Sequence, residues 1–280
     1  MPAEAGPGPG RVPPPGVAPR GAPRRGRTPV ILLPPSEGKA TGGRGRPWRP
    51  GTGVLPVLDE ARTTVLAALS ARMPTGPGEE ADLADVAAAP TMRAIERYTG
   101  VLYGQLDWPS LPPAARRLGN RTVLIASGLW GVSAPGDRIP HYRLKMGGNL
   151  APLGTLSTWW RPRLTAALAD RLAGRLVWDL LPNEHAAAWR PHDVPMARRV
   201  TVRFLDRHGR TVSHWNKLLK GALVRHILTE RPPGPEALAG WDHPSGYRVD
   251  AVASRLDDDP ALLVLTETVA VAASRSSPIL

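Results

Sequence analysis

The residue types best suited to chemistry lie in one glycine-rich stretch, SGLWGVSAPGDRIPHYRLKMGGNL, at residues 127–150. Asp137 has the carboxyl group of a general acid or base. Tyr142, Arg143 and Lys145 place an aromatic ring beside two cations, a combination typical of contacts with bases and phosphates. Two glycines permit sharp turns or a close approach of the backbone to a ligand: Gly128 and Gly131. A well-packed loop with a solvated arginine fits the same residues, so both interpretations stay open.

A second candidate site is the sequence PPSEGKATGG, at residues 34–43. Its glycine–lysine pair is shared with the phosphate-binding loop of NTPases, but that motif also needs glycine and serine or threonine where this chain has Leu33 and Ala40. The NTPase motif is therefore excluded. Ser36 and Lys39 still follow a predicted buried strand, which is where α/β sheets usually bind ligands. A polar turn that binds nothing is the alternative.

Two later segments add candidate groups. Glu184 follows the third predicted strand and is either an acid or base for catalysis or the acidic residue that a helix N-terminus favours. Lys217, Lys220 and Arg225 lie near one side of a predicted amphipathic helix. A basic helix face fits phosphate binding, although a solvated face has the same pattern.

The elements that must position these groups are strands and helices in mixed order. Short apolar runs predict buried strands at residues 29–35, 121–127 and 175–182. Apolar residues at helical spacing predict helices at residues 54–73, 155–174 and 213–230. A hairpin is predicted at 198–215, and late strands at 246–250 and 261–268. Because a strict βαβ rhythm is missing, we expect an α+β fold with a mixed central sheet wrapped by helices, and not a doubly wound Rossmann sheet.

The charge of the chain favours polyanionic partners. The 280 residues contain 36 Lys and Arg against 24 Asp and Glu, a formal net charge of +12, which suits nucleic acid or nucleotides. A GC-rich coding bias toward arginine explains the same excess. The chain has no cysteine, which excludes disulfides and thiol catalysis, and its seven histidines are scattered. We therefore predict no metal site and no cofactor.

The ends of the chain differ from its middle. Residues 1–27 are rich in Pro, Gly and Arg, and we expect a disordered tail or an overcalled translation start. Residues 28–268 are expected to form a single domain, followed by a flexible tail at 269–280. No apolar run is long enough to span a membrane, and the N-terminus lacks the apolar region of a secretory signal. The expected location is the cytoplasm, and the pattern indicates no particular oligomeric state.

Several segments together resemble the YaaA-like peroxide stress family, in the family's order. They include ILLPPSEGKA, IASGLWGVSAPGDRIPHYRLKMG, VWDLLPNEH and the helix around WNKLLKGALVRH. The resemblance implies a bacterial protein that limits free intracellular iron under peroxide stress and binds duplex DNA through a positive cleft. The family pattern falls on Ser36, Lys39, Gly128, Gly131, Asp137, Tyr142, Arg143, Met146, Gly147, Glu184, Lys217, Lys220, Gly221 and Arg225. The added Glu37, and the residues at 145 and 185, indicate a divergent, actinobacterial-type branch.

Three hypotheses follow for function. The first is a DNA-binding stress protein in which Lys39, Arg143, Lys217 and Lys220 contact phosphates. The second is an enzyme that acts on a nucleobase, nucleoside or nucleotide, with Asp137 or Glu184 as acid or base and Arg143 with Lys39 as the clamp on a phosphate or oxyanion. The third is an iron- or partner-binding protein without catalysis. The first two require that distant segments form one electropositive recess, and turnover is left open.

Overall fold

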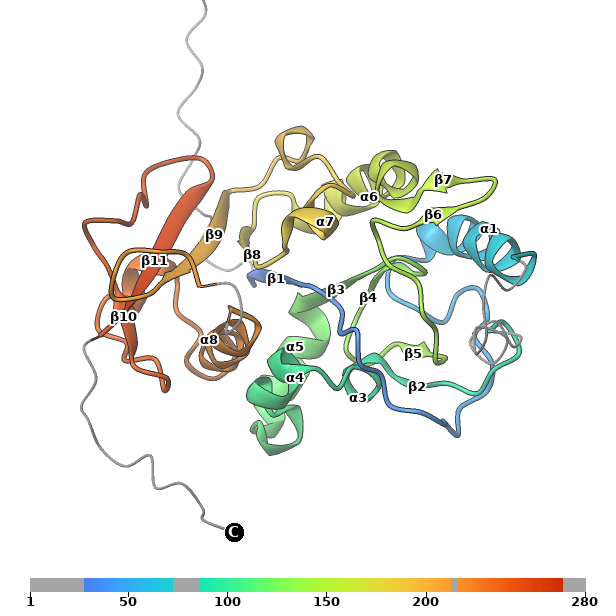
Figure 1. The fold of residues 1–280 in the computed structure, drawn as a ribbon, viewed down its shortest axis with the longest axis horizontal. Helices are drawn as coiled ribbons and strands as arrows, with labels where there is room; N and C mark the ends of the chain where they lie inside the picture. Colours follow the sequence, from blue (N-terminus) through green and yellow to red (C-terminus); the bar gives the residue numbers. More distant parts are fainter. Residues whose placement is uncertain (1–27, 73–85, 213–215, 269–280) are drawn as a thin grey trace, which may run out of the picture.

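The computed structural model describes residues 28–72, 86–212 and 216–268 (Figure 1). The segments predicted to be tails, residues 1–27 and 269–280, lie outside this described part, as does the end of the predicted hairpin at 213–215.

A seven-stranded sheet forms the centre of the molecule. Its strands, in chain order, are β1 (Val30–Leu33), β3 (Val123–Ser127), β4 (Gly131–Ser133), β8 (Leu176–Asp179), β9 (Arg198–Leu205), β10 (Tyr247–Val249) and β11 (Ala261–Glu267). In space they lie in the order β10-β11-β9-β8-β1-β3-β4. The five inner strands are parallel, while β10 and β4 pair antiparallel at the two edges. The predicted mixed sheet of an α+β fold is therefore confirmed.

Helices cover both sides of the inner strands. They are α1 (Asp59–Ser70), α3 (Ala94–Arg97), α4 (Val101–Leu106), α5 (Pro113–Thr122), α6 (Leu156–Leu172), α7 (Asn183–Ala186) and α8 (Asn216–Glu230). In Figure 1, α4, α5 and α8 gather on one side of β1 and β3, and α6 and α7 lie on the other. Two small ladders complete the fold: β2 (Met92–Arg93) with β5 (Arg138–Ile139), and β6 (Asn149–Leu150) with β7 (Gly154–Thr155).

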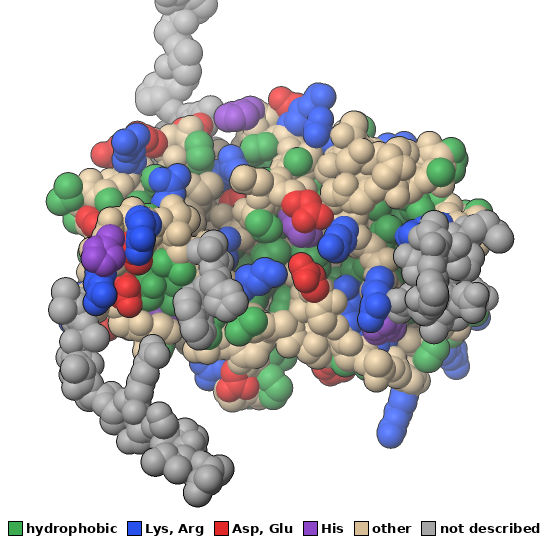
Figure 2. Space-filling model, viewed as in Figure 1, with side chains coloured by type: hydrophobic (Ala, Val, Ile, Leu, Met, Phe, Trp, Pro, Cys, Tyr) green, Lys and Arg blue, Asp and Glu red, His purple; other side chains and the backbone are tan. Residues whose placement is uncertain are grey.

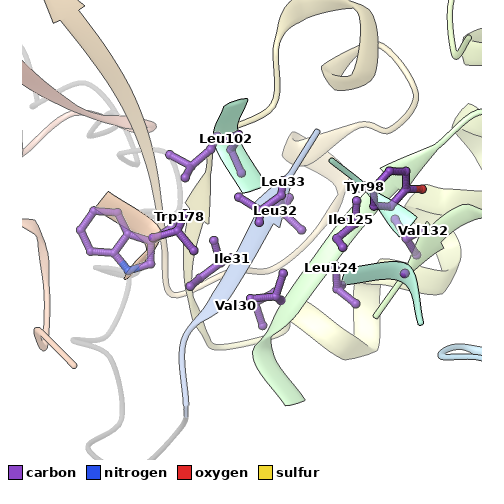
Figure 3. Close-up of a cluster of buried hydrophobic side chains, with 14 of the residues drawn as sticks. Val30, Ile31, Leu32, Leu33, Tyr98, Leu102, Leu124, Ile125, Val132 and Trp178 are labelled. Atoms are coloured by element: carbon purple, nitrogen blue, oxygen red, sulfur yellow. The ribbon is translucent and has the colours of Figure 1, made fainter. Parts of the chain in front are cut away.

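Strand β1 is buried on both faces, which explains why its sequence is a continuous apolar run. All four of its side chains are buried, and Figure 3 shows them projecting to both sides of the strand. Trp178 of β8 and Ile125 of β3 pack in the same cluster. Such runs are typical of the inner strands of a parallel sheet.

A topological switch point lies between the neighbouring strands β1 and β8, because the connections that follow them run in opposite directions along the sheet. From β1 the chain continues to β3 on one side, and from β8 it continues to β9 on the other. In parallel sheets, ligands bind outside the carboxyl ends of the strands where the connections diverge in this way. The segments that begin at this position are residues 34–39 after β1 and residues 180–184 after β8.

One buried and two half-buried histidines make stability depend on pH. His243 is 3% exposed; its Nε2 lies 3.0 Å from the carbonyl oxygen of Leu219, and its Nδ1 accepts from the Ser245 amide, so the ring is neutral. Burial lowers the pKa of His243, and also those of His185 and His226, below the usual 6.5. Below about pH 6.5 the unfolded chain therefore binds protons that the folded protein does not.

We expect the free energy of unfolding to fall between pH 7.5 and pH 5. Urea denaturation followed by circular dichroism measures this slope. The variant His243→Gln, compared at the same two pH values, should show a smaller difference than the unsubstituted protein. A flat profile between pH 7.5 and pH 5 would contradict the neutral state of these rings.

Candidate functional site

Lys39 lies in a half-buried position just after β1. Its backbone forms an isolated bridge with Tyr98, and its Nζ donates to the carbonyl oxygen of Ser36 at 3.0 Å. The ammonium group lies 4.7 Å from the ring centre of Tyr142 and 5.8 Å from that of Tyr98. Burial, and then the positive charge of Arg143, lower the pKa of Lys39 to about 8. The structure thus brings the first predicted loop together with Tyr142 and Arg143.

Three buried tyrosines form the floor beneath Lys39. The hydroxyl of Tyr142 lies 2.8 Å from that of Tyr98 and 2.6 Å from Ser127 Oγ. Tyr103 stacks on Tyr98 and donates to the carbonyl oxygen of Pro34 at 2.7 Å. Burial raises the pKa of all three phenols, so they are neutral at physiological pH. Tyr142 therefore supports the site from below instead of presenting an exposed ring for base stacking.

The two glycines of the central stretch allow a close approach between parts of the chain itself. A Cβ at Gly128 would lie 2.7 Å from the carbonyl oxygen of Leu144, and one at Gly131 would lie 2.9 Å from the Trp160 ring. Gly131 also has a φ of +67°, which favours glycine. Gly128 lies in the turn between β3 and β4, and Gly131 begins β4. The close approach at Gly128 holds the segment that carries Arg143 and Lys145 against this turn.

A pocket of about 210 Å³ opens where the loop after β1 meets α4 and α8. Ser36 and Glu37 line it from the first loop, Gly100 from the start of α4 and Lys217 from α8. Ser36 is buried and Lys217 is exposed. Two predicted site residues from distant segments are therefore brought together here, at the position where the connections of β1 and β8 diverge.

Lys220 and Glu184 organise the loop that follows β8. Lys220 is 9% exposed, and its Nζ donates to the carbonyl oxygen of Leu180 at 2.9 Å; burial lowers its pKa. Glu184 Oε1 accepts from the amide of Gly147 at 2.8 Å and so joins this loop to the central stretch. Lys220 thus faces the protein interior, in contrast to the solvent-facing cation expected from the helical pattern.

Asp137 and Arg225 make contacts that hold the fold together elsewhere. Asp137 accepts hydrogen bonds from the amides of Val54 and Ala134, and burial raises its pKa. Arg225 Nη1 donates to the carbonyl oxygens of Leu106 and Asp107, at the end of α4. Within the described residues no contact joins Asp137 to Glu184, so the two predicted acid–base groups are not assembled into a pair.

Sequence reasoning missed a second cationic site, which we call the arginine recess. It has a volume of about 530 Å³ and is lined by Arg44, Arg46, Trp48 and Arg138, with no acidic residue among its lining residues. Arg93 is the residue opposite Arg138 across the β2–β5 ladder, and like charges in such positions repel. The signal for this site was the run GRGRPWR, which lies in a segment without any Asp or Glu.

Positive and negative side chains are mixed on the face drawn in Figure 2. The face drawn in Figure 2 carries Lys and Arg side chains interspersed with acidic ones, and neither sign forms a broad continuous patch there. Any polyanion bound on this face would therefore depend on a small number of cations.

Two kinds of site are not found in the part of the chain that the structure describes. No three or more His, Asp and Glu side chains there are grouped so that they could hold a metal ion. None of the helices in residues 28–72, 86–212 and 216–268 has the length and apolar character needed to cross a bilayer.

Comparison with known proteins agrees with the resemblance in the sequence. The family described as peroxide stress protein YaaA matches residues 31–253. A UPF0246 protein of Streptomyces coelicolor is 42% identical over 241 residues, which cover 80% of this chain and 93% of the relative. Another, of Corynebacterium efficiens, is 37% identical over 215 residues, which cover 71% of this chain and 85% of the relative. This chain belongs to the YaaA family of peroxide stress proteins.

Proposed function

We propose that this protein contributes to peroxide stress resistance by binding duplex DNA and by keeping free intracellular iron low. The observation that carries the DNA-binding part is the arginine recess. Arg44, Arg46 and Arg138 line it together with Trp48, and Arg93 faces Arg138 across the ladder, without an acidic side chain in the lining. Guanidinium groups held together in this way repel one another, and phosphates of a polyanion relieve that repulsion.

The arginine recess and the site around Lys39 are joined by one short segment of the chain. Lys39 bridges to Tyr98 and Gly45 bridges to Thr91, so residues 39–45 run alongside residues 91–98. Arg97 fastens this segment by donating to the carbonyl oxygen of Gly42 at 2.9 Å. The six residue steps from Lys39 to Gly45 span at most about 20 Å, and duplex DNA presents one phosphate per about 1.7 Å of axis. A single duplex is therefore long enough to contact both sites.

The first test is the salt dependence of DNA binding. Each phosphate contact contributes about 0.9 to the slope of log affinity against log salt concentration. We expect Arg44→Gln and Arg138→Gln each to lower that slope by about one and to weaken binding to all sequences similarly. Fluorescence anisotropy with a labelled duplex at four salt concentrations measures this.

The matched control is Arg248→Gln. Arg248 is an exposed arginine on β10 that pairs with Asp242 and lies outside both sites, so its replacement should leave the slope unchanged. If all three substitutions had equal effects on the slope, the binding would be explained by the net charge of the protein and not by the arginine recess. Binding that ignores salt, or no binding near physiological salt, would overturn the proposal. The same measurement on Arg143→Gln and Lys217→Gln decides whether the duplex also reaches the pocket.

The iron part of the proposal is tested in cells. Free iron, measured in whole cells by electron paramagnetic resonance after peroxide treatment, should rise when the protein is deleted and return to normal on complementation. Complementation with the double variant Arg44→Gln/Arg138→Gln shows whether the effect on iron depends on the recess. Unchanged free iron after deletion would count against this role.

The alternative enzyme, with Asp137 or Glu184 as acid or base on a nucleotide, receives less support from the geometry. Both carboxylates accept hydrogen bonds from backbone amides, and they do so in different parts of the fold. Neither has a contact with Lys39 or Ser36 among the described residues.

A further inference from the structure

Lysine is rare in this chain, and its few positions lie in the same region of the fold. Of the 36 basic residues, four are lysine and the remaining 32 are arginine. The four lysines are Lys39, Lys145, Lys217 and Lys220. Lys39 lies in the loop after β1. Lys145 lies in the segment that packs closely against Gly128. Lys217 lines the pocket with Ser36, and Lys220 donates to the loop after β8. All four therefore surround the carboxyl ends of β1, β3 and β8.

A chain that uses arginine at 32 of 36 positions does not need lysine for positive charge alone. Arginine binds phosphates and carboxylates at least as well, because its planar fork forms two parallel hydrogen bonds. Only the lysine amine, however, readily loses its proton in a buried setting and then acts as a nucleophile or base. The presence of all four lysines near one site thus indicates that a lysine amine acts there as a nucleophile or base.

Lys39 is the member of this group whose surroundings favour the unprotonated amine. The charged and titratable groups that act on it are Arg143 and Arg97, which disfavour its charge, and Glu37, which favours it. The rings of Tyr98 and Tyr142 lie beside its Nζ and carry no charge at neutral pH. With a pKa of about 8, about a tenth of the Lys39 side chains carry a free amine at pH 7.

We propose that Lys39 is a reactive amine that forms an imine with a small carbonyl compound bearing an anionic group, an activity separate from DNA binding. The lone pair of the unprotonated Nζ attacks the carbonyl carbon, and the carbonyl oxygen takes up a proton from solvent. The nitrogen then gives up one of its protons to the departing hydroxyl, and loss of this water leaves a protonated double bond between Nζ and that carbon. Arg143, which acts on Lys39 electrostatically, and Lys217, which lines the pocket beside Ser36, are the cations placed to hold the anionic group.

The probe for this activity is pyridoxal 5′-phosphate, which combines an aldehyde with a phosphate, followed by reduction with borohydride and mass-spectrometric mapping. Because the chain has only four lysines, each labelled position is resolved. We expect Lys39 to take most of the label at pH 7.5, with a rate that has its midpoint near pH 8 and levels off about one pH unit higher. Lys145 and Lys217 are exposed, and each should take up less label than Lys39 at pH 7.5.

Three variants and a second probe test the parts of the proposal separately. Lys39→Arg keeps the charge but removes the primary amine, so it should abolish the dominant label, whereas Lys145→Arg should leave the labelling of Lys39 unchanged. Arg143→Gln removes a positive charge and should move the midpoint of the pH profile of Lys39 upward. Pyridoxal, which lacks the phosphate, should label Lys39 at least several-fold more slowly.

Defined outcomes would overturn the inference. Equal labelling of the four lysines, or slowest labelling at Lys39, would show that Lys39 is not unusually reactive. Equal labelling rates for pyridoxal 5′-phosphate and pyridoxal would show that the site does not recognise an anionic group on the ligand. Circular dichroism melting curves confirm that each variant is folded before labelling is compared, and the Arg143→Gln profile tests the proposal without changing Lys39 itself.

Discussion

Replacing Gly221 with alanine is expected to destabilise the protein by about 1–2 kcal/mol, although alanine is the better helix former. Gly221 lies in α8, where an added Cβ would fall too close to the carbonyl oxygen of Leu102 and only 3.1 Å from the amide nitrogen of Leu106 in α4. The gain in helix propensity is about 1 kcal/mol. Overpacking a close contact costs about 1–3 kcal/mol, and more where the obstacle is backbone that cannot rotate away. The clash therefore outweighs the propensity.

The effect should extend to the candidate site because α8 carries its lysines. Lys217 lies one turn before Gly221, and Lys220 is the preceding residue, so a shift of α8 away from α4 moves both. Gly104→Ala in α4 is the matched control: Gly104 is exposed, with no atom within 4 Å of an added Cβ, and this change should stabilise the protein by about 0.5–1 kcal/mol. Urea denaturation of the two variants measures the contrast. Stabilisation by both would mean that the helices are not in close contact.

The variant Arg62→Met should show the largest loss of stability, about 3–5 kcal/mol. Arg62 is 2% exposed and donates to the carbonyl oxygens of Trp130, Val132 and Val54 while it pairs with Asp59 at 2.7 Å. Methionine matches the apolar stem but leaves these acceptors without a donor. It also leaves the buried Asp59 carboxylate without its cation, which is the costly way to break a buried pair.

Arg210→Met provides the comparison for an exposed pair. The side chain of Arg210 is 76% exposed and pairs with Asp206, and pairs of this kind contribute about 0–1 kcal/mol. Denaturation midpoints of the two variants, at constant m-value, give the difference. If Arg62→Met were no worse than Arg210→Met, the buried network would not be holding the segment around Val54 against the β3–β4 turn.

The inner strands could be predicted from the sequence, whereas their parallel arrangement could not. The apolar runs that contain β1, β3 and β8 are short and continuous, and strands buried on both faces produce this pattern. The connection from β1 to β3, however, covers residues 34–122 and contains several short elements. That long connection hides the alternation of strand and helix from which a parallel sheet is inferred.

Part of the candidate site could be predicted from the sequence, because the residues that follow parallel strands meet at one edge of the sheet. Ser36 and Lys39 follow a strand, and the carboxyl ends of parallel strands meet at one edge. The pattern around Lys220 is that of a polar helix face, but α8 packs against both α4 and the loop after β8, which buries this residue. A loop carboxylate such as Asp137 looks the same in sequence whether it caps amides or transfers protons.

The arginine recess shows a different limit. Its residues Arg44 and Arg138 come from distant segments, and the ladder that holds Arg138 opposite Arg93 has only two residues on each strand. Strands of that length produce no measurable periodicity in sequence.

The short antiparallel edges of the sheet determine how copies of this protein can meet. The edge strands β4 and β10 each have three residues, and β4 is buried along its whole length. An edge this short offers an incoming strand very few amide and carbonyl groups to pair with. Joining two sheets into a continuous one, the usual route to fibres and swapped dimers, is therefore disfavoured, and self-association would have to use side chains on the helices and loops.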